Sequence, residues 1–137
     1  MSAFFDTNIL IYAQQSGPKA QIAQALMAGG GVISVQVLNE TANVLLRKFG
    51  RNWAEVEQVL TDIEDVLGPA LPLTGQTHRA AIGLARDHGL SIYDALIVAA
   101  ALEAECDQLL SEDLQHGRRF GALVVQNPFA VQNDIGA

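Results

Sequence analysis

The chain has 137 residues, half of them apolar, which suits one domain with a sizeable buried core. The net charge of −7 argues against a protein that holds nucleic acid by unspecific attraction, because that binding relies on Lys and Arg. The single cysteine, Cys106, excludes an intramolecular disulfide and a multi-cysteine zinc site, and it fits a reducing compartment.

No membrane segment or export signal is expected from the sequence. The longest apolar run, residues 95–102, is far shorter than the roughly 20 residues that span a bilayer. The N-terminus has no basic flank ahead of an apolar stretch. We therefore expect a soluble, cytoplasmic protein without membrane contact.

The first half of the chain alternates short apolar segments with stretches of helical spacing. In chain order we expect a strand over 3–5, helices over 8–14 and from 18 to about 27, a strand over 32–34, and a helix ending near residue 50. Asp6 follows the first strand directly, and Glu40 lies in the early turns of the third helix.

The second half opens with the capping-box pair Asn52 and Glu55. We expect a helix from there to 67, followed by an edge strand over 71–73. Two helices should follow, one from Thr74 or Thr77 to about His88 and one from Ser91 to about Cys106. The last elements expected are a strand over 108–111, a loop or one-turn helix over 112–120, and a strand over 123–125. Residues 95–102 are apolar on every face of their helix, which should therefore be buried on nearly all sides. Residues 131–137 are expected to form a loose tail.

This alternation predicts an α/β fold, a single domain whose mostly parallel sheet is covered by helices on both faces. The carboxyl ends of parallel strands gather side chains from distant parts of the sequence. At such places the chain carries four acids: Asp6, Glu40, Asp94 and Asp113. Their mutual repulsion would raise their pKa values, and a hard divalent cation such as Mg²⁺ or Mn²⁺ would relieve it. Such ions can support phosphodiester cleavage.

Each acid also has an ordinary structural explanation. Asp6 suits an N-cap, and Asp94, three residues after Ser91, suits a capping box. Glu40 suits an exposed helix position, and Asp113 suits a turn. The combination favours a functional site, because an unpaired carboxylate opening a buried helix would be costly.

Four segments resemble the acidic motifs of the PIN domain family, in the order of that family. They are Phe5 to Tyr12 with its Asp6-Thr7-Asn8, Ser34 to Glu40, Tyr93 to Ile97 with Tyr93-Asp94-Ala95, and Leu110 to Leu114 with Ser111-Glu112-Asp113. The resemblance covers nearly the whole chain and implies a PIN-like domain over 1–130, a three-layer α/β/α sandwich. Small single-domain members are similar to VapC-type toxins, which are Mg²⁺- or Mn²⁺-dependent endoribonucleases neutralised by an antitoxin.

The resemblance assigns catalysis and metal binding to Asp6, Glu40, Asp94 and Asp113. Residues that would orient these acids or a bound water are Thr7, Asn8 and Ser111, the last standing where the family often has Thr. Glu112 is expected to point away from the metal. Candidate RNA contacts are Arg118, Arg119 and His116, each of which also suits a solvated surface.

The resemblance and the residues together predict a ribonuclease toxin that acts on RNA, binds a cognate antitoxin and forms a homodimer. Two alternatives stay open. One is a catalytically inactive PIN-like binding protein. The other is a metal-dependent phosphatase with Asp6 as nucleophile, against which the missing Asp-x-Asp pattern at Asp6 to Asn8 counts.

Overall fold

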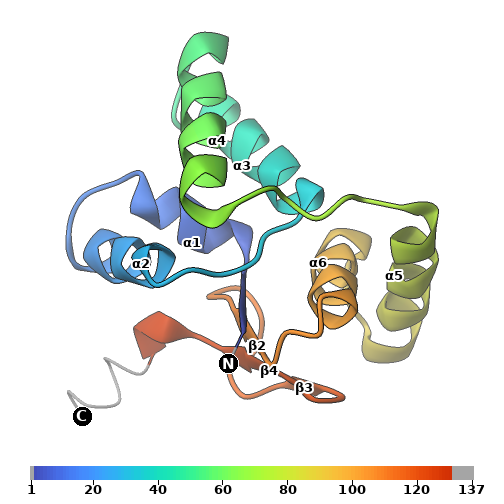
Figure 1. Cartoon of the computed structure of the whole chain (residues 1–137). Coiled ribbons are helices and arrows are strands. Elements are labelled where there is room, and N and C mark those ends of the chain that lie inside the picture. Colours follow the sequence, from blue (N-terminus) through green and yellow to red (C-terminus); the bar gives the residue numbers. More distant parts are fainter. Residues whose placement is uncertain (1, 131–137) are drawn as a thin grey trace.

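The computed structural model describes residues 2–130 and shows a small sheet with helices on both sides (Figure 1). The strands are β1 (Ala3–Phe5), β2 (Gln108–Leu110), β3 (Arg119–Phe120) and β4 (Leu123–Gln126). The helices are α1 (Thr7–Ala13), α2 (Pro18–Ala28), α3 (Val35–Arg47), α4 (Trp53–Leu67), α5 (Gly75–His88) and α6 (Ile92–Glu103). Helices α1 and α2 lie on one side of the sheet, α5 and α6 on the other, and α3 and α4 project beyond them (Figure 1). The predicted α/β class is confirmed.

The sheet has the strand order β1-β2-β4-β3, with β1, β2 and β4 parallel. The segments expected as strands at 32–34 and 71–73 form only isolated parallel bridges, from Phe4 to Val32 and from Ser34 to Leu71. Strand β3 was not predicted; it runs antiparallel to β4, where a loop or one-turn helix was expected. Gly121 adopts a φ of 61° in the two-residue turn, a conformation that favours glycine and lets the chain reverse there.

Most helix ends follow the signals in the sequence. The capping box of Asn52 and Glu55 opens α4, and Thr74 caps α5, whose last residue is His88. Helix α6 ends at Glu103, before the expected Cys106, because Glu105 turns into the left-handed region with a φ of 56°.

The core forms where β1, β2 and α6 meet. Phe4, Phe5 and Leu109 are at most 1% exposed, and so is Ile97 of α6. Every α6 residue from Ala95 to Ala101 is buried, which confirms the prediction for this helix. A side chain at Gly31 would lie 2.5 Å from the Phe5 ring, so this position after α2 requires glycine to let the backbone approach.

Among residues 2–130, no helix is both long enough and apolar enough to cross a bilayer. The tail predicted over 131–137 lies outside the described residues.

Candidate functional site

The sheet register places Asp6 beside Ser111. Phe5 pairs with Leu110 at the ends of β1 and β2, and the Asp6 amide continues the ladder by donating to the Leu110 carbonyl at 3.0 Å. Parallel strands therefore deliver both following residues to the same edge. There the Ser111 hydroxyl donates to Asp6 Oδ2 at 2.6 Å.

Asp6 is both a helix cap and a buried carboxylate, being 3% exposed. Its Oδ1 accepts from the Thr7 amide at 2.7 Å and caps α1. Burial raises the pKa of Asp6 to about 7; hydrogen bonds from Ser111 and Thr7 lower it, and the neighbouring charges of Asp113 and Glu40 raise it further. A carboxylate in this setting is costly to ionise without a cation nearby.

Glu40 reaches the same edge from α3. Its Oε1 accepts from the Thr7 hydroxyl at 2.8 Å, and its Oε2 accepts from the Gln36 amide, one helical turn earlier, at 2.9 Å. Thr7 thus contacts two of the predicted acids, Asp6 through its amide and Glu40 through its hydroxyl.

Asn8 joins Asp6 to the loop after β2. Its Nδ2 lies 3.2 Å from Asp113 Oδ2 and 3.5 Å from Asp6 Oδ2, while its Oδ1 accepts from the Glu112 amide at 3.1 Å. The Ser111 hydroxyl accepts from the amides of Asp113 and Leu114, each at 3.2 Å. The structure thus places all three predicted orienting residues, Thr7, Asn8 and Ser111, in contact with the acids.

Asp94 approaches from the start of α6. Its amide donates to the hydroxyl of the N-cap Ser91 at 3.1 Å, which is the Ser91 half of the expected capping box. Its half-buried carboxylate lines a cavity of about 650 Å³ together with Glu40 and Tyr93. Burial raises the pKa of Asp94, and the charge of Asp113 raises it further. All four predicted acids are therefore linked by contacts, a shared cavity or electrostatic coupling.

A second cavity, of about 420 Å³, extends the site in another direction. Its lining includes Asn8, Glu40, Asn43, Lys48 and Asp113, and it shares Glu40 and Asn43 with the cavity beside Asp94. Three polar residues of these cavities were not predicted as site residues: Gln36, Asn43 and Lys48. Helical spacing would have found Gln36 and Asn43, which stand four residues before Glu40 and three after it on α3. Lys48 is the C-cap residue that follows this helix.

The chemistry of the acids fits Mg²⁺ or Mn²⁺, which prefer oxygen ligands. Burial raises the pKa of Asp6, and a nearby cation would favour its charged form. Within residues 2–130, no three or more His, Cys, Asp or Glu side chains already converge to hold an ion. Asp113 is exposed and Glu40 and Asp94 are intermediate in exposure, so an ion could reach these three side chains from solvent.

The remaining predicted residues are the candidate RNA contacts Arg118, Arg119 and His116, together with Glu112. The Arg118 guanidinium donates to the His88 carbonyl at 2.7 Å, and the His116 ring accepts from the Asn127 amide at 2.9 Å. Arg119 is exposed on β3. The Glu112 carboxylate accepts hydrogen bonds from Tyr12 and Lys19.

The solved structures that resemble this chain include three at 18–22% identity. A toxin–antitoxin complex from Klebsiella pneumoniae aligns with a TM-score of 0.68 and 22% identity, covering 93% of this chain and 98% of that one. VapBC2 from Rickettsia felis, bound to a DNA fragment from its promoter, gives 0.68 and 18% over the same shares. VapC20 of Mycobacterium tuberculosis, a toxin that cleaves the sarcin-ricin loop, gives 0.66 and 21%, covering 82% of this chain and 92% of that one.

The search of curated proteins gave no match. The sequence model of the PIN domain matches residues 3–119, a span that contains all four acids and the helices and strands that carry them. The chain belongs to the PIN domain family.

Proposed function

We propose that the protein is a metal-dependent endoribonuclease that hydrolyses RNA phosphodiester bonds, and that it is the toxin of a toxin–antitoxin pair. The observation that carries this proposal is the buried Asp6, which lies among Asp113, Glu40 and their hydrogen-bond partners at the carboxyl edge of the sheet. Membership of the PIN domain family supports it.

The chain's residues would divide the work as follows. Asp6, Glu40, Asp94 and Asp113 would hold Mg²⁺ or Mn²⁺, which when bound supplies activation of a water and stabilisation of the leaving oxygen. Thr7 holds Asp6 and Glu40 in a fixed relation through two hydrogen bonds. Ser111 and Asn8 do the same for Asp6 and the loop that carries Asp113.

The RNA would lie in the two cavities that meet at Glu40. Lys48 supplies a positive charge beside the acids and can neutralise a phosphate. Arg119 is an exposed candidate for a more distant phosphate. Arg118 and His116 remain proposed contacts, with their bonds to His88 and Asn127 as competing structural roles.

We also propose an antitoxin partner and a homodimer. One similar structure is a toxin–antitoxin complex and another is VapBC2 on promoter DNA, which supports an antitoxin partner here. The predicted homodimer would use a surface other than the alanines of α6, since Ala95, Ala99, Ala100 and Ala101 are buried within the chain.

The test is cleavage of RNA by the purified protein with Mg²⁺ or Mn²⁺. We expect activity to vanish in excess EDTA and in Asp94→Asn, while the circular dichroism spectrum stays unchanged. Asp87→Asn is the matched control, because Asp87 is an exposed acid paired with Arg86 and outside the site. Full activity in Asp94→Asn or in EDTA would overturn the mechanism.

A second candidate is a PIN-like protein that binds RNA or a protein without cleavage. It is favoured by one observation, the lack of a preassembled metal group among residues 2–130. This candidate predicts no turnover with either ion and no calorimetric signal for Mn²⁺. Detectable Mn²⁺ binding that Asp94→Asn abolishes would exclude it.

A further inference from the structure

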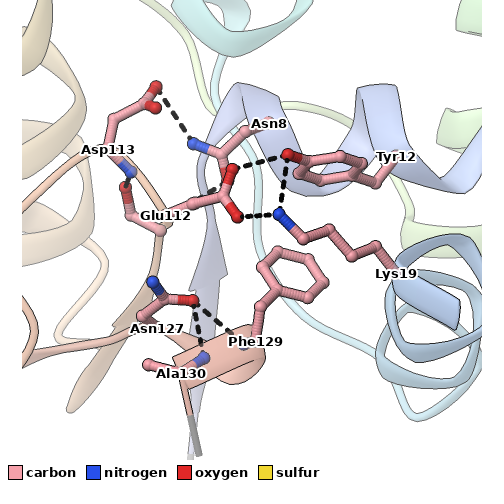
Figure 2. Close-up of polar contacts among 9 residues, drawn as sticks. Asn8, Tyr12, Lys19, Glu112, Asp113, Asn127, Phe129 and Ala130 are labelled. Carbon is pink, nitrogen blue, oxygen red and sulfur yellow. Dashed lines mark hydrogen bonds and ion pairs between the residues drawn. The ribbon is translucent and has the colours of Figure 1, made fainter. Parts of the chain in front are cut away.

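A network of contacts lies beside Asp113 and includes residues that have no role in the proposed metal site (Figure 2). The Lys19 ammonium donates to Glu112 Oε2 at 2.6 Å and to the Tyr12 hydroxyl at 3.2 Å. The Tyr12 hydroxyl donates to Glu112 Oε1 at 2.6 Å. Both oxygens of the Glu112 carboxylate are therefore engaged.

The network is completed by the ring of Phe129, which lies in the C-terminal turn, residues 127–130. The Phe129 and Tyr12 rings meet edge to face with centroids 5.0 Å apart, and Lys19 Nζ lies 5.3 Å from the Phe129 centroid. Asn127 Oδ1 holds this turn by accepting from the amides of Phe129 and Ala130. We call four residues the clasp: Tyr12, Lys19, Glu112 and Phe129. The clasp ties α1, α2 and the C-terminal turn to the loop after β2.

The clasp holds the residue that directly precedes Asp113. The Glu112 amide donates to Asn8 Oδ1 at 3.1 Å, and the same Asn8 side chain donates to Asp113 Oδ2 at 3.2 Å (Figure 2). The Asp113 side chain is exposed, so its location depends on the backbone of this loop. Ser111 fixes the start of the loop through its hydroxyl, and the clasp fixes Glu112.

We propose that Lys19, acting through Glu112, is a positioning residue that sets the location of Asp113. This inference rests on the proposed function, because Asp113 is one of the acids assigned to the metal. The Lys19 side chain is 50% exposed, and exposed ion pairs add little to global stability. Lys19 holds the Glu112 carboxylate directly and also bonds to Tyr12, which holds the other oxygen of that carboxylate. Its removal should therefore loosen the loop that carries Glu112 while the fold persists.

The experiment compares Lys19→Met, which keeps the apolar stem, with Lys19→Arg, which keeps the charge. Tyr12→Phe is an independent second variant that keeps the ring and removes the hydroxyl. Arg86→Met is the matched control, because it breaks another exposed ion pair, that of Arg86 with Asp87 at 2.7 Å. Three quantities are measured: amide exchange of Glu112 and Asp113 without metal, Mn²⁺ affinity by calorimetry, and RNA cleavage at rising Mn²⁺.

We expect Lys19→Met to speed exchange of the two amides and to weaken Mn²⁺ affinity by about tenfold, the usual effect of losing a group that orients a metal ligand. Cleavage should fall at low Mn²⁺ and recover at high Mn²⁺, a rescue that a general loss of stability would not show. Tyr12→Phe should act in the same direction, while Lys19→Arg and Arg86→Met should resemble the wild type.

Unchanged exchange and unchanged Mn²⁺ affinity in Lys19→Met would overturn the inference. A wild type that neither binds Mn²⁺ nor cleaves RNA would instead overturn the proposed function and the metal-positioning role with it. In that case the exchange measurement still decides whether the clasp orders the loop.

Discussion

Without metal, Asp6 should make the stability of the protein depend on pH. Burial raises its pKa from 3.8 to about 7. The folded state therefore keeps a proton that the unfolded chain loses above about pH 4, and folding becomes less favourable as the pH rises to about 7. Since a tenfold change in proton affinity is worth about 1.4 kcal/mol, the loss amounts to about 4 kcal/mol.

The perturbation that tests this is Asp6→Asn, which cannot ionise. Denaturant unfolding in EDTA is followed by far-ultraviolet circular dichroism at pH 4, 6 and 8, because Trp53 is 67% exposed and a poor fluorescent reporter. The free energy of unfolding of the variant minus that of the wild type should rise by about 4 kcal/mol from pH 4 to pH 8. A fixed cost of the new amide cancels in this comparison.

A change smaller than about 1 kcal/mol across this pH range would refute the reasoning about Asp6. Asp87→Asn serves as the control. Arg86 lowers the pKa of Asp87, so any pH dependence of that variant should be small and of the opposite sign. Because Asp87 is fully exposed, solvent screens the interaction.

Three further outcomes are expected. Mn²⁺ at a hundred times its Kd should stabilise the wild type against thermal unfolding by about 2.7 kcal/mol at pH 8. The stabilisation should be smaller at pH 5, where Asp6 holds a proton, and equal stabilisation at the two pH values would contradict this. Ser111→Ala removes a donor to Asp6 and the acceptor of two loop amides, and should cost about 1–3 kcal/mol in denaturant unfolding. Gly31→Ala should cost about 1–3 kcal/mol by pressing on Phe5, whereas Gly83→Ala in α5, which meets only an arginine tip at 3.8 Å, should be neutral or stabilising.

The fold was predictable wherever the signal was local. The capping box of Asn52 and Glu55 and the all-round apolar α6 were both found as predicted, because each depends on residues a few positions apart. Strand pairing was less predictable. The 32–34 segment has strand character, yet it forms only bridges, and the short β3 exists because Gly121 lets residues 119–120 fold back on β4.

The positions of the acids were predictable from strand ends, whereas their contacts were not. Asn8 reaches Asp113 across 105 positions of sequence, and Lys19 reaches Glu112 across 93. Such pairs depend on how β1 pairs with β2 and how α2 packs on α1, which bring together segments far apart in the sequence. The placement of Gln36 and Asn43 beside Glu40 was predictable, because both lie within about one turn of it on α3.

The two explanations offered for Asp6 from sequence, helix cap or metal ligand, are compatible in the structure. Oδ1 caps α1 through the Thr7 amide, and Oδ2 meets Ser111 on the side of the other acids. Asp6→Asn keeps an oxygen for the cap and loses the charge, whereas Asp6→Ala loses both. Asp6→Ala should therefore be less stable than Asp6→Asn by about 1 kcal/mol at pH 4. Both variants should fail to bind Mn²⁺ in calorimetry. Equal stability of the two at pH 4 would show that the cap contributes nothing and that Asp6 serves the site alone.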